Sequence, residues 1–184
     1  MKEVNGSSDN ISVSRGDSSP WPAVETAHIA FLLDARDDFE AGLLRDWVES
    51  RKPDDDSRPP YSFIKLPKSG ADNLLATLPE QDDGVWMQPL RIAWLPTSSA
   101  GSSRSLQDLF HGRITEPGRI RRRTIARFSP DRLAYVVGDG AYRHELRERQ
   151  ADAPVDDDNL PRFVVNQALI ALERAERLVR GARY

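Results

Sequence analysis

Apolar and polar positions alternate between two regular patterns in the first half of the chain. A continuous apolar run at residues 27–33 is typical of a strand that is buried on both faces. At residues 37–51 the apolar side chains recur at helical spacing, with acidic residues in the first turn and basic residues at the end, which predicts an amphipathic helix. Residues 61–66 and 71–78 repeat the two patterns and predict a second strand and a short helix.

The second half of the chain continues this alternation. We expect strands at residues 90–95 and 133–137, and helices at residues 106–110 and 142–150. Strands that alternate with helices at this spacing favour a parallel or mixed sheet covered by helices, because parallel neighbours require crossover connections. The predicted fold is therefore an α/β sandwich of the Rossmann-like kind.

The two ends of the chain differ from this core. Residues 1–22 are rich in small polar residues and predict a disordered leader ahead of an α/β domain at residues 23–150. An acidic linker at residues 151–159 precedes a long amphipathic helix at residues 160–184, which has a proline near its start. The apolar stripe of this helix must pack on another surface, so we expect a further domain downstream.

Composition excludes several classes of function. The net charge is -3, whereas binding to nucleic acid normally needs a strongly basic face, so we expect no nucleic-acid partner. Cysteine is absent and there are three histidines, which leaves no thiolate chemistry and makes a metal cluster improbable. The leader lacks the apolar core of a secretory signal, and no apolar run approaches the roughly 20 residues that span a bilayer. These features fit a reducing, cytoplasmic compartment.

The densest basic cluster lies in the segment at residues 118–127. It contains five arginines, interleaved with apolar residues: Arg119, Arg121, Arg122, Arg123 and Arg127. Arginine grips phosphate groups well, because its planar guanidinium can donate two parallel hydrogen bonds. We interpret the cluster either as a solvated basic face or as a contact for an anionic membrane surface or partner.

Other candidates for chemistry are weaker. Gly138-Asp139-Gly140 follows a predicted strand, as in a dinucleotide fingerprint, but Arg143 stands where the third glycine would be, so a strand-to-helix turn is the better interpretation. His28 lies in a predicted buried strand and His144 on a predicted helix, and neither has a convincing acidic neighbour for general-base catalysis. We therefore assign no catalytic, cofactor-binding or metal-binding residue.

Four sequence blocks, in the same order, carry a resemblance to a known family. The blocks are PLRIAWLP at residues 89–96, GRIRRR at 118–123, LAYVVG with ELR at 133–147, and RFV with ALIALERAE at 162–176, and FIKLP at 63–67 adds support. In these blocks the chain resembles the amino-terminal part of the bacterial membrane-associated glycerol-3-phosphate acyltransferases, especially the actinobacterial kind. The resemblance covers most of residues 60–184 but includes no catalytic signature.

The resemblance implies a peripheral enzyme on the cytoplasmic side of the cell membrane. Enzymes of this family transfer a fatty acyl group from acyl-CoA or acyl carrier protein to the first hydroxyl of glycerol 3-phosphate, with no further cofactor, and so begin phospholipid synthesis. Their catalytic histidine is followed five positions later by an aspartate. Five positions after the three histidines here stand Leu33, Glu116 and Arg149, so none of them fits the motif.

Two interpretations follow from the missing motif. In the first, the chain is an accessory region whose partner is a downstream acyltransferase domain of the same polypeptide, with the arginine cluster as a candidate contact for the anionic membrane. In the second, it is a stand-alone Rossmann-like domain for binding or scaffolding, without catalysis. A nucleotide-using enzyme built on Gly138-Asp139-Gly140 is a weaker third interpretation.

Overall fold

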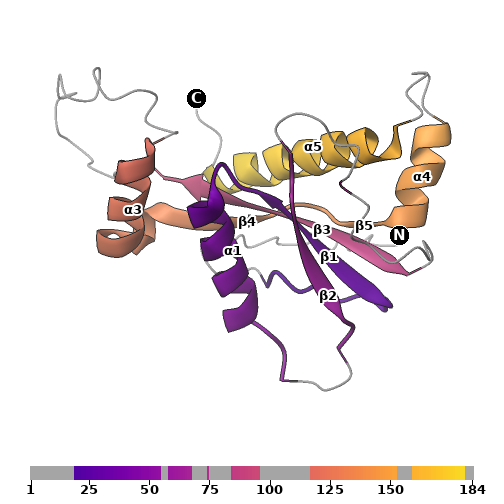
Figure 1. Cartoon of the computed structure of the whole chain (residues 1–184), viewed down its shortest axis with the longest axis horizontal. Helices are drawn as coiled ribbons and strands as arrows, with labels where there is room; N and C mark the ends of the chain where they lie inside the picture. Colours follow the sequence, from indigo (N-terminus) through magenta and orange to yellow (C-terminus); the bar gives the residue numbers. More distant parts are fainter. Residues whose placement is uncertain are drawn as a thin grey trace, which may run out of the picture.

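The computed structural model describes residues 19–54, 58–67, 74, 84–95, 117–152 and 159–180. In chain order the described elements are β1 (His28–Asp34), α1 (Asp38–Ser50), β2 (Tyr61–Lys65), β3 (Val85–Trp94), α3 (Arg119–Phe128), a 3-10 turn η1 (Pro130–Arg132), β4 (Leu133–Val137), β5 (Ala141–Tyr142), α4 (Arg143–Ala151) and α5 (Leu160–Arg180). Figure 1 shows one central sheet with helices on both of its faces. The predicted helices at residues 71–78 and 106–110 lie outside the described residues, apart from Leu74.

The sheet is mixed, as predicted. Its order is β2-β1-β3-β4, and β5 pairs with the other end of β3. β1 is parallel to both β2 and β3, whereas β4 and β5 run antiparallel to β3. The chain is therefore an α/β sandwich with an open sheet, and its first three strands keep the crossover topology of a doubly wound fold.

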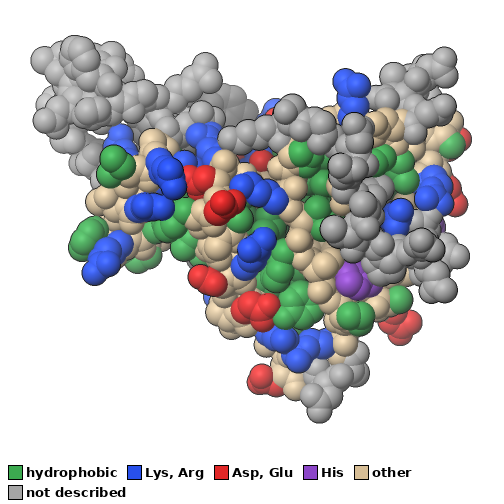
Figure 2. All heavy atoms as spheres, in the orientation of Figure 1, with side chains coloured by type: hydrophobic (Ala, Val, Ile, Leu, Met, Phe, Trp, Pro, Cys, Tyr) green, Lys and Arg blue, Asp and Glu red, His purple; other side chains and the backbone are tan. Residues whose placement is uncertain are grey.

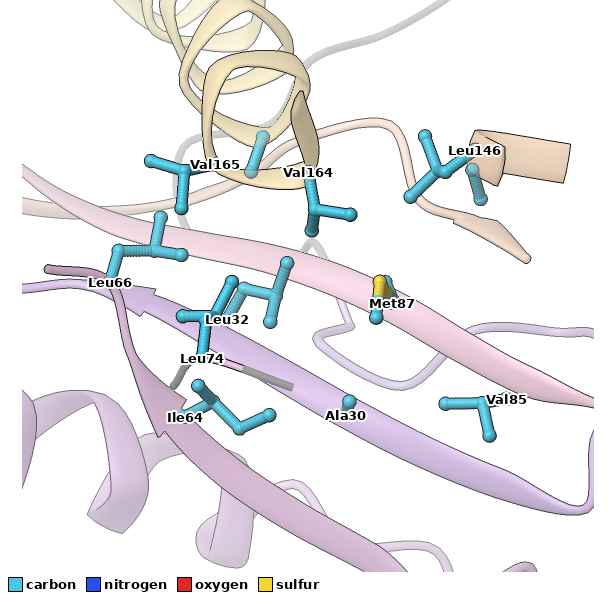
Figure 3. Close-up of a cluster of buried hydrophobic side chains, with 12 residues drawn as sticks. Ala30, Leu32, Ile64, Leu66, Leu74, Val85, Met87, Leu146, Val164 and Val165 are labelled. Carbon is cyan, nitrogen blue, oxygen red and sulfur yellow. The ribbon is translucent and has the colours of Figure 1, made fainter. Parts of the chain in front are cut away.

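The central strand β1 is buried on both faces, as its continuous apolar run predicts. Phe31 and Leu33 point into a cluster with residues of α1 and α3, and Ala30 and Leu32 point into a second cluster beneath α5. Figure 3 shows this second cluster, in which Val164 of α5 lies over the strands. Alternate side chains of β1 are therefore buried on opposite faces of the sheet, so this strand contributes to the core beneath α1 and to the core beneath α5.

Helix α1 begins at a strong cap. Asp37 is the N-cap residue, and its Oδ1 accepts a hydrogen bond from the Glu40 N–H at 3.0 Å. The apolar face then buries Leu44 and Trp47 against the sheet. The indole of Trp47 stacks on the ring of Tyr135 in β4, with centroids 4.4 Å apart. One helix therefore spans the sheet from β1 to its edge strand.

Helix α5 covers the other face. Asn159 stands at its start, where its Oδ1 accepts a hydrogen bond from the Arg162 N–H at 2.9 Å. The buried positions of α5 are Val164, Val165, Ala168 and Leu172. The predicted helix extends to residue 184, but residues 181–184 lie outside the described residues. The stripe predicted for this helix thus packs, at least in its central turns, on the sheet of the same domain.

Strand β3 begins at Val85, five residues before the predicted start at Leu90. The prediction started late because Gln88 and Pro89 interrupt the apolar pattern. Pro89 has no N–H to donate to Gly138, which faces it in the ladder and donates its own N–H to the Pro89 carbonyl at 3.0 Å. The buried Gln88 side chain supplies the missing donor, since its Nε2 lies 2.7 Å from the Gly138 carbonyl oxygen. The strand tolerates its proline because the preceding glutamine satisfies the freed carbonyl.

The folded part also begins before the boundary expected at residue 22. Trp21 packs edge-to-face on Phe31, with ring centroids 5.2 Å apart, and its Nε1 donates a hydrogen bond to the Val48 carbonyl at 3.0 Å. The end of the segment expected to be a leader therefore closes one side of the core.

The two glycines of the turn after β4 have packing roles. A Cβ on Gly138 would lie 3.2 Å from backbone atoms of Ala171 and Leu172 in α5, and a Cβ on Gly140 would lie 2.5 Å from the indole of Trp86. Gly138 thus lets α5 approach β4, and Gly140 lies against an aromatic ring. The Gly138-Asp139-Gly140 segment is a strand-to-helix turn that leads through β5 into α4.

A pair of glycine substitutions tests this packing. Gly138→Ala should lower the free energy of unfolding by about 1–3 kcal/mol, because the backbone of α5 must move to admit the methyl group. Gly42→Ala, inside α1 with nothing within 4 Å of its new Cβ, should raise the free energy of unfolding by about 0.5–1 kcal/mol. Urea denaturation followed by circular dichroism measures both. Equal effects of the two substitutions would contradict the close approach of α5 at Gly138.

Candidate functional site

The basic segment at residues 118–127 forms helix α3, which divides its arginines between an inner and an outer face. Residues four positions apart lie above one another on a helix. Arg122 and Ile125 are buried, Arg121 is half-buried, and the remaining arginines are exposed. The five arginines expected to act together are therefore not one surface.

The inner arginine is an anchor. The Nη1 of Arg122 lies 2.6 Å from Oε1 of the buried Glu40, and its Nη2 lies 2.9 Å from Oδ2 of Asp37. Both carboxylates belong to the start of α1. Because these ion pairs occupy the guanidinium inside the protein, Arg122 is excluded from the predicted contact surface.

The Glu40 carboxylate also binds two further donors. Its Oε1 accepts a hydrogen bond from Nε1 of Trp94 at 2.9 Å, and its Oε2 accepts one from the backbone N–H of Arg36 at 2.7 Å. Trp94 is the last residue of β3. A single carboxylate therefore connects the β1–α1 turn, the end of β3 and, through Arg122, helix α3. A buried charge with this number of partners is well compensated.

The sequence contained a signal for this carboxylate that the prediction did not use. Asp37 and Glu40 have the spacing of a capping box, in which the residue at the third helical position reaches back toward the start of the helix. That spacing places Glu40 in the first turn. It does not reveal that an arginine more than eighty residues later completes the pair.

The outer face of α3 consists of two adjacent rows. One row is Arg119, Arg123 and Arg127, and the other is Ile120, Thr124 and Phe128. Ile120 and Phe128 are 83% and 73% exposed, which is high for large apolar side chains. Basic and apolar side chains gather over α3 at one end of the molecule in Figure 2.

No carboxylate in the described part of the chain forms an ion pair with the three outer arginines. Arg123 lies over the ring of Phe39, 5.5 Å from its centroid, and Arg127 lies 5.7 Å from the ring centroid of Phe128. Contacts of this kind orient a guanidinium without neutralising it. The outer face of α3 therefore combines positive charge with exposed apolar area, a combination that suits an interface between water and lipid or an acidic surface.

A second network of charged residues lies at the same end of the sheet, where β1 and β3 end. Arg91 of β3 binds Asp34 at the end of β1, with Nε 2.6 Å from Oδ2, and also binds Glu176 of α5 at 3.0 Å. Burial by itself lowers the pKa of Arg91, but the two carboxylates outweigh it and raise that pKa. The network ties α5 to the parallel strands and pairs Arg91 with two carboxylates near the strand ends where doubly wound folds often bind ligands.

A cavity of about 150 Å³ lies between α4, α5 and the Gly138–Gly140 turn. Most of its lining residues are apolar, and its polar lining residues are Arg149, Arg174, Asp139 and Gln167. This volume is below the range of about 300–1,000 Å³ that is usual for small-molecule sites. The ring of Trp86 also fills the space against Gly140, where a pyrophosphate would need to approach in a dinucleotide site.

The described histidines have structural partners. The Nε2 of His28 lies 2.9 Å from Oγ of Ser62, and burial lowers the pKa of His28. The His144 ring stacks on Tyr142. His111 lies outside the described residues. Within the described ranges no group of three or more metal-ligating side chains comes together, and no helix is both long and apolar enough to span a bilayer.

No family model matches this chain, and no solved structure matches it.

Removal of the buried Arg122 guanidinium should destabilise the fold. Arg122→Ala leaves Glu40 buried without its main counter-charge, so the free energy of unfolding should fall by about 3–5 kcal/mol. Arg123→Ala, one residue away on the outer face, should change it by less than about 0.5 kcal/mol. Chemical denaturation of both variants measures the difference, and a mild effect of Arg122→Ala would contradict the anchoring role.

The Asp37 carboxylate should make stability depend on pH. Burial by itself raises the pKa of Asp37, but the Glu40 N–H and the charges of Arg122 and Arg119 outweigh it, so the pKa lies below its ordinary value. The resulting stabilisation is complete above an unfolded-state pKa of about 4 and is lost as the pH falls through the folded-state value.

Asp37→Asn tests this dependence, because asparagine still caps a helix but carries no charge. Between about pH 4 and pH 2, the free energy of unfolding of the variant should fall less steeply with acidification than that of the parent. Denaturation curves at several pH values provide the slopes. Identical slopes in the two proteins would count against the assigned ion pair.

Proposed function

We propose that this chain is the amino-terminal accessory region of a glycerol-3-phosphate acyltransferase and that the outer face of α3 contacts the anionic membrane. In this proposal a downstream domain transfers the acyl group from acyl-CoA or acyl carrier protein to the first hydroxyl of glycerol 3-phosphate. The accessory region holds that domain at the cytoplasmic surface of the cell membrane. The single observation that carries the membrane contact is the exposed face of α3, which combines basic and large apolar side chains.

The positions of the sequence blocks support the family assignment. The blocks that resemble the family fall on β3, on the start of α3, on β4 through α4, and on α5. Three of these elements, β3, β4 and α4, contact α5, and α3 contacts the 3-10 turn that leads into β4. The resemblance therefore covers one contiguous half of the domain.

The chemistry of the outer face favours an anionic membrane as its partner. Arg119, Arg123 and Arg127 can bind lipid phosphates, and each basic residue near such a surface contributes about 1 kcal/mol. Ile120 and Phe128 stand in the adjacent row, where they can enter the boundary between head groups and acyl chains. A purely acidic protein partner would use the arginines but would leave the two apolar side chains without a role.

Charge reversal tests the membrane contact. The triple substitution Arg119→Glu, Arg123→Glu and Arg127→Glu should weaken binding to phosphatidylglycerol-containing vesicles by at least about 100-fold, which corresponds to roughly 3 kcal/mol. Vesicle co-sedimentation of the chain at low and high salt measures the change. Parent binding should weaken with added salt and should be absent on pure phosphatidylcholine vesicles.

A matched control has the same change in net charge. Arg147, Arg149 and Arg162 are exposed arginines on α4 and α5. Their reversal to glutamate should leave most of the vesicle binding intact. If the two triple variants lose binding equally, only the net charge matters and the assignment to α3 fails.

The family assignment has its own test in the genome. A reading frame that continues past Tyr184 into a histidine followed five positions later by aspartate would support the acyltransferase. A natural stop codon after Tyr184 would instead favour the stand-alone Rossmann-like binding or scaffolding domain. Vesicle binding and the reading frame are independent, so either part of the proposal can fail alone.

A further inference from the structure

Within the described residues, one edge of the sheet carries features that discourage strand pairing between molecules, and the other edge does not. β2, at the first edge, is preceded by Pro59 and Pro60 and carries Lys65, whose Nζ lies 2.8 Å from Oδ1 of Asp38. β4, at the opposite edge, has the sequence LAYVV, without charge, proline or glycine. Prolines and edge lysines are common devices against strand pairing between molecules, and β4 has none of them.

Hydrogen bonds to β3 determine which backbone groups of β4 face outward. The Gly138 N–H donates to the Pro89 carbonyl at 3.0 Å, and the Leu95 N–H donates to the Arg132 carbonyl at 2.8 Å. In an antiparallel pair, residues bonded to the neighbour alternate with residues whose N–H and C=O point away. The outward-pointing groups of β4 therefore belong to Leu133, Tyr135 and Val137.

Most of these groups have no bonding partner in the described part of the chain. The Leu133 N–H donates to Pro130 in the 3-10 turn. The N–H groups of Tyr135 and Val137 and the carbonyl groups of all three residues remain available to an incoming strand. These are the groups that β-strand addition uses.

A second copy of β4 matches this edge. When two antiparallel copies are centred on Tyr135, the two Tyr135 residues exchange a pair of hydrogen bonds, and each Val137 N–H meets the Leu133 carbonyl of the other copy. Identical strands place like residues close together, so a charged strand would repel itself. β4 has no charge and avoids this penalty.

Helix α5 fits the same arrangement. It contacts both β3 and β4, so its axis lies near the outer edge of the sheet. Neighbouring strands are about 4.8 Å apart, so a twofold axis between paired β4 strands places the two α5 helices roughly 10 Å apart. That distance is close to the 8–10 Å of packed helices.

The flank of α5 toward β4 carries suitable side chains. The backbone of Ala171 lies against Gly138 at the end of β4, which identifies this flank. Ala175 and Leu178 follow at helical spacing on the same side. Leu178 is 67% exposed, and the two alanines permit a close approach of a second helix.

We infer that two copies of this chain associate through β4 and the Ala171–Leu178 flank of α5 to form one continuous sheet. The axis of such a pair is perpendicular to the sheet, so both α3 helices lie on the same side of the dimer. The association itself does not depend on the proposed membrane contact.

Sedimentation velocity of the chain without lipid, from about 1 to 300 µM, tests this inference. The parent should form dimers in a concentration-dependent way, and Leu178→Arg should raise the dimer dissociation constant at least about tenfold. Asn166→Arg is the matched control, because Asn166 is exposed on α5 and helical spacing places it on the side away from Ala171 and Leu178. It should leave the dissociation constant unchanged.

Hydrogen exchange locates the interface independently of any substitution. The amides of Tyr135 and Val137 should exchange more slowly at concentrations that favour the dimer. A parent that stays monomeric over the whole range overturns the inference. A dimer that Leu178→Arg leaves intact, or one without protection at these two amides, also overturns it. None of these results decides whether α3 contacts the membrane, because the arginine substitutions test that contact separately.

Discussion

The arrangement of this domain depends on one buried carboxylate. Glu40 lies at the start of α1 and accepts hydrogen bonds from the Arg36 amide, the Trp94 indole and the Arg122 guanidinium. Each donor comes from a different part of the chain, so the carboxylate fixes α1, β3 and α3 relative to one another. Because Arg122 is held inward, the rotation of α3 is set, and the rows that contain Arg123 and Ile120 must face outward.

This dependence explains what the sequence could and could not predict. The alternation of apolar and polar positions is local, and it predicted β1, α1, β4 and α5 with nearly the observed bounds. The roles of the arginines are not local. Arg122 and Arg123 are neighbours of the same type, and only the distant Glu40 decides that the first is an anchor and the second belongs to a surface.

Strand β3 illustrates a different limit. Its first half contains Gln88 and Pro89, which pattern analysis treats as breaks in a strand. The structure accommodates both, because the Gln88 side chain donates to the Gly138 carbonyl that the proline leaves unsatisfied. A local rule fails here for a physical reason, since a side chain replaces a backbone donor. The predicted strand therefore starts at Leu90, directly after this interruption, and misses the first five residues of β3.

The proposed dimer interface at β4 would strengthen the proposed membrane contact at α3, because a single short helix is a weak membrane anchor. Three arginines and two apolar side chains on a ten-residue helix offer limited binding energy, and salt screens much of it. Two copies of α3 on one side of a continuous sheet would engage the same membrane, and the second contact would form at high effective concentration. Dimerisation through the uncharged strand β4 would thus raise the affinity of α3 for the membrane without an additional basic residue.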